Sequence, residues 1–517
     1  MIRQVKQECF WSIPCTNKKQ KFDNFAKTSS RVGISTIPGV SQRSSDSPHH
    51  RPNLKSFKMA SDETLSSIAS RCCKRVYIGT AVLPKPLFLH DHQDEKGIPC
   101  GTISTVEQHQ LPDPDTPTNE LPQYTQTVLS EFNSIVIEHH LKWGPLVISQ
   151  SSPPTMHLGK YDFSHVDAMV DFAIKHDLYI KGHVLVWHVT SPPFLEEMNS
   201  SQVRTAVKRH IFTTMNYFKG RIKMFDVVNE SLASDGTLVE NIFYRKMGPD
   251  YIEQCFRWAH EADPTAFLIY NDNKVEGCQH DSTDENNDSG GSRHNKAPLQ
   301  AKADGFYNLL KDLVDKGVPI HGAGMQAHFS AGGTMHQRPP TPAMVKRQIR
   351  RIGELGLKVN ISEMDVRISK LPTASSADDK LKSAAQTQIY QDILSAALSE
   401  PSFDGIWLWG VSDRHTWVKN FYYDDAPLIF DEKYQRKESY VGVQNALKTL
   451  CPGGRVGEMM GGESAQCHLE QDVDEDGNAW GKSWMQPEPE EVGSGEKKSS
   501  DDTTKEGQPD WLLPDTH

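Results

Sequence analysis

Eight short apolar runs recur along the middle of the chain, and each is followed by residues with helical spacing. The runs are VYIGTAV, FNSIVIE, YIKGHVLVW, KMFDVVNE, AFLIYND, GAGMQAHF, KVNISEMDV and GIWLWGVSD, all within residues 75–450. Alternation of buried strands with helices is typical of βα units on a parallel sheet. Eight such units close a barrel. The sequence therefore predicts an α/β fold, a (β/α)₈ TIM barrel.

The segments between these runs have the spacing of amphipathic helices. In residues 164–176, SHVDAMVDFAIKH opens with Ser164 as a candidate N-cap, and KRQIRRIGELG at 346–356 ends at Gly356. Two stacked smaller α/β domains are the alternative, but they need a linker, and nothing of linker composition interrupts this region. We therefore expect one catalytic domain at residues 73–450.

The two ends of the 517-residue chain differ in composition from its middle. Residues 1–72 are basic and residues 451–517 are acidic, and both are poor in apolar side chains, so we expect disordered extensions. The basic head resembles a transit peptide and lacks the apolar core of a secretory signal; a mispredicted N-terminus is the alternative. Two insertions, at 83–120 and 280–295, are predicted to be surface loops.

Composition argues against several classes of protein. No stretch approaches the roughly 18 consecutive apolar residues of a membrane helix, so we expect a soluble protein. The basic head has no interleaved aromatic residues that would suggest a nucleic-acid site. Nine cysteines without CxxC spacing indicate neither a zinc site nor a disulfide framework, although Cys255 and Cys278 could bond if their segments are neighbours.

Polar residues gather where the apolar runs end. In a parallel barrel the C-terminal strand ends converge on one mouth, where polar residues are functional. The sets are His183, Trp187 and His188; Asp226, Asn229 and Glu230; Gln326 and His328; Glu363 and Asp365; and Trp407, Trp409 and Asp413. Each residue alone has a packing explanation, but their common position favours a site.

Two carboxyl groups, Glu230 and Glu363, end the fourth and seventh runs. Hydrolysis of a glycosidic bond usually requires two carboxyl groups, one on each side of the bond, and a pair across a barrel mouth meets this requirement. One protonates the leaving oxygen, and the other attacks the anomeric carbon or activates water. A separation of about 5.5 Å suits retention of configuration and roughly 6.5 to 9.5 Å suits inversion, so the sequence leaves this choice open.

Neighbouring residues could assist the two glutamates. Asn229 precedes Glu230 and can offer its amide to a sugar hydroxyl beside the reacting carbon. Asp365 lies two positions after Glu363 on a strand, so both side chains point to the same face. If His328 reaches between them, it can bond to Glu363 while Asp365 fixes its orientation.

Aromatic and basic side chains in the same stretches suit a sugar. Trp187, Trp409 and Trp417 supply flat apolar faces, and His183 and Lys142 supply donors for hydroxyl groups. We therefore expect a substrate that is a polyol with apolar faces.

The segments GHVLVWH, FDVVNE, GAGMQAHF, ISEMDV and WLWGVSDRHTW resemble, in this order, the signature segments of family 10 glycoside hydrolases, the (β/α)₈ endo-1,4-β-xylanases. The resemblance implies retaining cleavage of internal β-1,4 bonds of xylan through a glycosyl-enzyme intermediate. It places Glu230 as acid/base, Glu363 as nucleophile, and Asn229, His328 and Asp365 in support. The sugar subsites it implies consist of Glu138, Lys142, His183, Trp187, Gln326, Trp409 and Trp417.

The same resemblance implies no metal and no cofactor, and the composition leads us to expect no nucleic-acid or membrane partner. The polysaccharide substrate, xylan, is met outside the cell, so an extracellular place of action is expected, although no signal peptide is readable. We expect a monomer.

The chain departs from the family pattern in three motifs. EHHLKW has His139 in place of Asn, NDNK has Asn273 and Lys274 in place of Tyr and Asn, and PPFL has Phe194 in place of Trp. Both glutamates are untouched, so we expect bond cleavage to survive while contacts on either side of the bond differ. Losing an aromatic ring at Asn273 could cost about 1 kcal/mol of stacking.

Two other functions stay open at this point. A retaining barrel glycosidase could act on another β-1,4-glycan such as cellulose, which differs from xylan by one hydroxymethyl group per sugar. A catalytically silent carbohydrate-binding barrel would most simply arise by loss of one glutamate, and here both are present.

Overall fold

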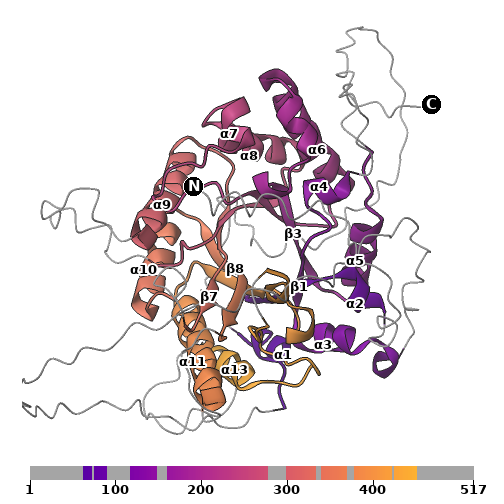
Figure 1. Cartoon of the computed structure of the whole chain (residues 1–517), viewed down its shortest axis with the longest axis vertical. Coiled ribbons are helices and arrows are strands. Elements are labelled where there is room, and N and C mark those ends of the chain that lie inside the picture. Colours follow the sequence, from indigo (N-terminus) through magenta and orange to yellow (C-terminus); the bar gives the residue numbers. More distant parts are fainter. Residues whose placement is uncertain are drawn as a thin grey trace, which may run out of the picture. The chain divides into compact units, whose positions relative to one another are not determined.

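Strands form at all eight predicted runs and close into one parallel barrel (Figure 1). They are β1 Tyr77–Val82, β2 Ser134–Ile137, β3 Tyr179–Val186, β4 Met224–Asn229, β5 Phe267–Asp272, β6 Gly322–Met325, β7 His328–Ser330, β8 Lys358–Arg367 and β9 Phe403–Leu408. Their order is β6-β5-β4-β3-β2-β1-β9-β8-β7, and β6 also pairs with β8, which closes the ring. The predicted (β/α)₈ barrel is confirmed.

The computed structural model describes residues 62–72, 75–89, 117–147, 160–277, 298–332, 339–369, 378–421 and 424–450. The predicted loop at 280–295, most of the insertion at 83–120, Cys278 and the tail at 451–517 lie outside these ranges. Within them, no helix has the length and apolar character needed to cross a membrane. The same ranges contain no cluster of three or more His, Cys, Asp or Glu side chains that could hold a metal ion.

The sixth predicted run is divided between two strands. β6 ends at Met325, β7 begins at His328, and Ala327 between them has a left-handed backbone with φ of 63°. β6 pairs with β5 and β8, whereas β7 pairs only with β8, with His328 opposite Asp365. The break leaves Gln326 and His328 free to contact different glutamates.

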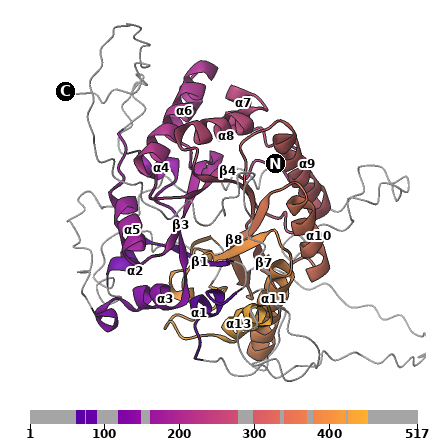
Figure 2. The ribbon, with the colours of Figure 1, turned by 180° about the vertical axis from the view of Figure 1, so that it is seen from behind.

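Helices surround the strands on the outside of the barrel in both views (Figure 1, Figure 2). They are α1 Leu65–Ala69, α2 Pro84–Phe88, α3 Gln123–Glu131, α4 Trp143–Leu146, α5 Ser164–Lys175, α6 Ser200–Tyr217, α7 Ile242–Met247, α8 Tyr251–Ala262, α9 Pro298–Asp315, α10 Pro342–Gly353, α11 Asp378–Leu398, α12 Val418–Phe421 and α13 Glu438–Leu450. The helices predicted at 164–176 and 346–356 are α5 and α10. Ser164 is the first helical residue rather than the N-cap, because Phe163 occupies that position and Asp162 Oδ1 accepts the Ser164 N–H at 2.9 Å.

A small apolar cluster fills the inside of the barrel. It consists of Ala81, Val136, Met224, Ile269, Trp407 and Trp409. Trp407 is fully buried there, its Nε1 donates to Ser134 Oγ at 2.9 Å, and its ring stacks on Tyr77. The prediction that Trp407 lies at the mouth is wrong. It shares a strand face with Trp409, but it comes two residues earlier and therefore lies deeper.

The helix α1 packs with the barrel. Leu65 and Ile68 are buried in the main core. Leu65 N–H donates to Glu131 Oε2 at 3.0 Å, and Gln444 Nε2 donates to the Glu63 carbonyl at 2.7 Å. These contacts contradict the expected boundary at residue 73, and the folded domain includes residues 62–72.

The cysteines also differ from expectation. Cys255 is a buried free thiol, so it does not form the bond to Cys278 that the sequence left open. Cys72 is disulfide-bonded, and cysteine spacing gave no indication of it.

Candidate active site

Glu230 and Glu363 both lie where strands reach the mouth of the barrel. Glu230 directly follows β4, and its backbone N–H donates to the Asn271 carbonyl at 3.0 Å. Glu363 lies within β8, and its N–H donates to the Gln326 carbonyl at 3.1 Å. Glu363 is only 5% exposed, whereas Glu230 is partly exposed. The two carboxyl groups therefore share one mouth and differ in their access to solvent.

Two amide side chains connect these glutamates through Asn229. Gln326 Nε2 donates to Glu230 Oε1 at 2.9 Å and to Asn229 Oδ1 at 3.2 Å. Asn271 Nδ2 donates to Glu363 Oε1 at 2.7 Å and to Asn229 Oδ1 at 3.0 Å. Because the Asn229 oxygen accepts both bonds, its Nδ2 is the atom that remains to donate to a substrate hydroxyl.

A chain of hydrogen bonds runs from Glu363 to Trp417. His328 Nε2 lies 3.2 Å from Glu363 Oε2, and His328 Nδ1 lies 2.8 Å from Asp365 Oδ2. Trp417 Nε1 donates to the same Asp365 oxygen at 2.8 Å. The structure thus brings together the three side chains for which the sequence suggested a relay.

Electrostatics in this chain favour an ionised Glu363. Burial alone would raise the pKa of Glu363, but the neighbouring His183, His328 and Lys142 outweigh it and hold the pKa at about 2. Burial would lower the pKa of His328, but Asp365 and Glu363 outweigh burial and raise it to about 10. At neutral pH the imidazolium of His328 therefore donates from both ring nitrogens to two carboxylates.

A second buried carboxylate, that of Asp226, contacts the His183 and Lys181 side chains below Glu363. Asp226 Oδ2 lies 2.9 Å from His183 Nδ1, and Asp226 Oδ1 lies 3.1 Å from Lys181 Nζ. His183 Nδ1 also lies 3.9 Å from Glu363 Oε1. Asp226 thus orients His183 under the site, and it does not face the mouth beside Glu230 as predicted.

Glu230 has neutral hydrogen-bond donors and a strained backbone. Trp187 Nε1 donates to Glu230 Oε2 at 3.1 Å, on the side opposite to the Gln326 bond. Glu230 has φ of 53°, and the nearby Lys274 and Ala327 have φ of 58° and 63°. Left-handed backbone costs roughly 1 to 2 kcal/mol for a non-glycine residue, so its concentration here is typical of a functional site.

Comparison with known proteins identifies the family. The sequence profile of glycosyl hydrolase family 10 matches residues 89–286 and 293–446, more than half of the chain and every mouth residue described above. The chain belongs to glycosyl hydrolase family 10. As a family 10 member it is a glycoside hydrolase.

Individual relatives of this family 10 hydrolase are similar in sequence and in fold. It is 33% identical over 330 residues to endo-1,4-beta-xylanase B of Thermotoga neapolitana, which covers 63% of this chain and 84% of that protein. The crystal structure of xylanase 10B from Thermotoga maritima superposes with a TM-score of 0.58 at 29% identity, over 75% of this chain and 99% of that one. Xylanase 10B from Thermotoga petrophila RKU-1, solved in complex with xylobiose, gives 0.59 at 28% identity, over 76% and 100%.

On the β2 side of the hydrolase's mouth, a lysine lies against two tryptophans. Lys142 Nζ lies 4.9 Å from the ring centre of Trp187 and 5.8 Å from that of Trp409. Burial lowers the pKa of Lys142, and three glutamates, Glu363, Glu138 and Glu230, act against it. Burial raises the pKa of Glu138 to about 7, opposed by Lys142 and assisted by Glu363. The predicted subsite residues Glu138, Lys142, Trp187 and Trp409 are therefore neighbours.

His139, which replaces the Asn of the family motif, is uncharged. Burial and the charges of Lys142 and His140 lower its pKa to about 3. A neutral imidazole has one donor and one acceptor, so it keeps the hydrogen-bonding types of the amide it replaces.

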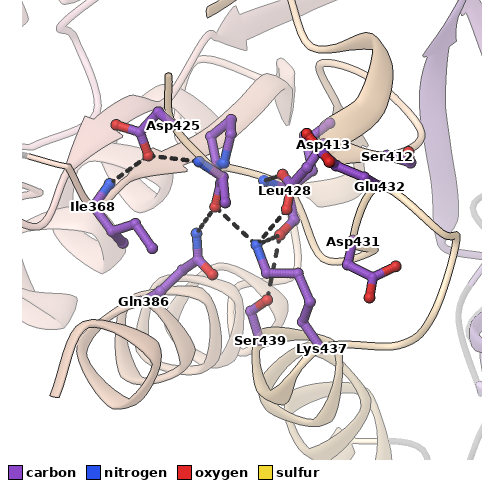
Figure 3. A network of polar contacts seen from close by, with 12 residues as sticks. Ile368, Gln386, Ser412, Asp413, Asp425, Leu428, Asp431, Glu432, Lys437 and Ser439 are labelled. Carbon is purple, nitrogen blue, oxygen red and sulfur yellow. Dashed lines mark hydrogen bonds and ion pairs between the residues drawn. The ribbon is translucent and has the colours of Figure 1, made fainter. Parts of the chain in front are cut away.

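Asp413 does not belong to the mouth, contrary to the prediction. Lys437 Nζ lies 2.8 Å from Asp413 Oδ2 and also donates to the carbonyls of Ala426 and Leu428, at 2.8 and 2.7 Å (Figure 3). Gln386 Nε2 donates to the same Ala426 carbonyl at 2.7 Å. Burial raises the pKa of Asp413 to about 6, and Lys437 acts against this rise. The network holds the loop after β9 against α11 and α13.

One site residue, Asn271, escaped the sequence analysis. Its side chain donates hydrogen bonds to both Glu363 and Asn229. It belongs to the NDNK motif, in which only Asn273 and Lys274 depart from the family pattern. The available signal was a polar pair, Asn271 and Asp272, ending an otherwise apolar run. Asp272 instead stabilises the loop after β5. Its Oδ2 accepts a hydrogen bond from the Tyr270 hydroxyl at 2.7 Å, and its Oδ1 lies 2.8 Å from Lys302 Nζ.

Proposed function

We propose that this family 10 hydrolase is a retaining endo-1,4-β-xylanase whose nucleophile is Glu363 and whose acid/base is Glu230. The observation that carries the proposal is the unequal surroundings of the two carboxyls. Glu363 is buried beside three basic side chains, whereas the hydrogen bonds to Glu230 come from the neutral Trp187 and Gln326. The names of the similar proteins, which are xylanases, support xylan as the substrate.

In the first step the ionised Glu363 attacks the anomeric carbon while Glu230 gives its proton to the glycosidic oxygen. The bond from that carbon to the leaving chain breaks, and a glycosyl ester of Glu363 forms. In the second step Glu230, now a carboxylate, takes a proton from water, whose oxygen displaces Glu363 from the same carbon. Two inversions give net retention.

Supporting residues fix the reacting groups in this scheme. Asn271 and His328 each donate to a different oxygen of Glu363, which sets the orientation of the nucleophile. Asn229 is held by Gln326 and Asn271, so its Nδ2 can bond to the sugar hydroxyl beside the reacting carbon. That bond strengthens as positive charge develops on the sugar.

Sugar rings on the glycone side would lie against the tryptophans. Trp409 lies edge-on to His183 with ring centres 5.1 Å apart, and Trp417 lies 5.0 Å from the His328 ring. With Glu138, Lys142, His183, Trp187 and Gln326 they would form the subsites. The catalytic domain would extend to residue 450 and would be followed by the acidic tail.

The test compares polymeric xylan with carboxymethyl cellulose in a reducing-sugar assay. We expect xylan to be cleaved faster, with a rapid fall in viscosity that marks internal cuts, and the first product to have the β configuration by NMR. Equal rates on both polymers would contradict xylan as the substrate. An α product would contradict retention, and normal xylan cleavage by Glu363→Ala would contradict its role.

A further inference from the structure

Lys274 lies on the rim of the mouth just past the end of β5. The Glu230 N–H bonds to the Asn271 carbonyl, which places the strand end beside the acid/base glutamate. Lys274 follows three residues later, and its side chain reaches solvent although it is partly covered by its neighbours. Glu276, two residues further, is buried and its Oε1 accepts the Ala327 N–H at 2.8 Å, which fixes this loop against the break between β6 and β7.

The charged neighbours of Lys274 have partners of their own. Lys302 Nζ lies 2.8 Å from Asp272 Oδ1 and donates to Asn273 Oδ1 at 2.9 Å. Arg367 is buried at the end of β8, where its Nε donates to the Phe329 carbonyl. In the part of the chain that the structure describes, no carboxylate forms an ion pair with Lys274.

Charges of both signs surround Lys274. Burial and the charges of Lys302 and Arg367 lower the pKa of Lys274, while Glu276 and Glu230 act in the opposite direction. Lys302 and Arg367 are already engaged by Asp272 and by the Phe329 carbonyl, so Lys274 is the cation of this group that is exposed to an incoming anion.

The backbone gives no reason for a lysine at this position. Lys274 has φ of 58°, a conformation that asparagine adopts more readily than lysine. The family motif that this chain resembles has asparagine there. A residue kept in a left-handed conformation at a site points to a task for its side chain.

The position of Lys274 in the ring of strands indicates on which side of the cleaved bond it lies. The sugar-binding residues Glu138 and Lys142 follow β2, whereas Lys274 follows β5, with β3 and β4 between them. Glu230 protonates the oxygen of the departing chain, and Lys274 is on the side of Glu230 away from β2. With these roles, a sugar that leaves with that oxygen would extend toward the β5 side of the mouth, where Lys274 lies.

We propose that Lys274 binds a carboxylate carried as a uronate substituent by the polysaccharide on the leaving-group side of the cleaved bond. This inference rests on the proposed function. It makes acidic xylan a better substrate than a neutral xylan of the same length.

The experiment compares the full-length wild type with Lys274→Asn on uronate-bearing xylan and on the same polymer after reduction of its carboxyl groups. We expect Lys274→Asn to lower kcat/KM on the acidic polymer roughly three- to tenfold, mainly through KM. The reduced polymer should be cleaved equally by both proteins. Raised salt should remove the wild-type preference for the acidic polymer.

Two controls separate recognition from other effects. Lys433→Gln removes an exposed lysine elsewhere and should behave as wild type on both polymers. An aryl xylobioside has no sugar on its leaving side, so Lys274→Asn should cleave it normally.

Three results would overturn the inference. Equal kcat/KM of Lys274→Asn and wild type on the acidic polymer would show that the lysine does not contact the substituent. An equal loss on both polymers, with a shifted pH profile, would show that Lys274 acts on Glu230 instead. Failure of the wild type to cleave either polymer would refute the proposed function and Lys274's role with it.

Discussion

His328 Nε2 lies 3.2 Å from Glu363 Oε2, and the other nitrogen of the same ring is held by Asp365 at 2.8 Å. The imidazolium therefore lies between two carboxylates, and its positive charge stabilises both of them. This arrangement keeps the pKa of Glu363 low although the carboxyl group is buried. The cost is that Glu363 depends on a partner from another strand, β7.

The fall of kcat/KM at low pH, the acid limb of its pH profile, should depend on the contact between His328 and Glu363. Glu363 must be ionised to attack, and its folded pKa of about 2 lies below its ordinary value. Replacing His328 by Asn removes a charge that favours the ionised form, while burial, which disfavours it, remains. We expect the acid limb of kcat/KM to move to higher pH, and kcat at its optimum to fall roughly tenfold or more. Initial rates from pH 3 to pH 9 measure both, because a limb that moves up from about pH 2 enters this range.

Asp365→Asn is the matched control for His328→Asn. It keeps the shape of the side chain and removes the charge that raises the pKa of His328, so the acid limb should move in the same direction by less. An acid limb that stays in place in both variants would contradict the role of His328.

Asn271 should matter for rate although it need not touch the sugar. Asn271→Ala leaves Glu363 Oε1 without its 2.7 Å donor and frees the Asn229 amide to turn. Hydrogen bonds to charged groups contribute about 1.5 to 3 kcal/mol, so we expect kcat to fall roughly 10- to 100-fold with little change in KM. Steady-state kinetics on xylo-oligosaccharides check this. Replacement of the exposed Asn216 by Ala should leave kcat unchanged.

The Asp413 and Lys437 pair should affect stability in a pH-dependent way. Asp413 has a folded pKa raised to about 6, so its contribution to stability is fully present below pH 4 and is lost as pH rises through 6. Lys437→Met leaves the buried carboxylate without its cation and should cost about 3 kcal/mol near pH 8. The loss should be smaller at pH 5, where Asp413 can accept a proton.

Thermal unfolding at pH 5 and pH 8 tests this, with Lys433→Met as the control in the same loop. Equal destabilisation by Lys437→Met at both pH values would mean that its carbonyl contacts matter more than its charge.

The fold was predictable because the barrel strands are buried on both faces, so each of the eight runs is rich in apolar residues. The break in the sixth run was not predictable, because GAGMQAHF contains no turn residue at Gln326 or Ala327. The left-handed conformation of Ala327 is held by tertiary contacts, including the bond from its N–H to Glu276.

The site was partly predictable for a related reason. Burying a carboxylate costs free energy, so carboxylates at the ends of apolar runs, such as Glu230 and Glu363, indicate a functional role. They could therefore be identified from the sequence. Trp407 was misplaced because alternation along a strand gives the face of a side chain and not its depth in the barrel. Asn271 was missed because an amide has no feature that distinguishes structural from functional use until its partners are known.

The clearest test of the two carboxyls uses leaving groups of different quality. Glu230→Gln cannot protonate the departing oxygen, so xylan cleavage should fall roughly 10²- to 10⁴-fold. A dinitrophenyl xylobioside needs no proton for departure, so its first step should be nearly normal and should leave the glycosyl ester of Glu363 to accumulate. Azide, which needs no general base, should then release the β-glycosyl azide.

Glu363→Ala is the matched comparison, because it removes the nucleophile and leaves the acid. It should lose cleavage of both substrates, and azide entering the vacated space should give the α-glycosyl azide by a single inversion. NMR of the two azide products distinguishes the assignments, since the two carboxyls predict opposite anomers. An α-azide from Glu230→Gln together with a β-azide from Glu363→Ala would exchange the two roles.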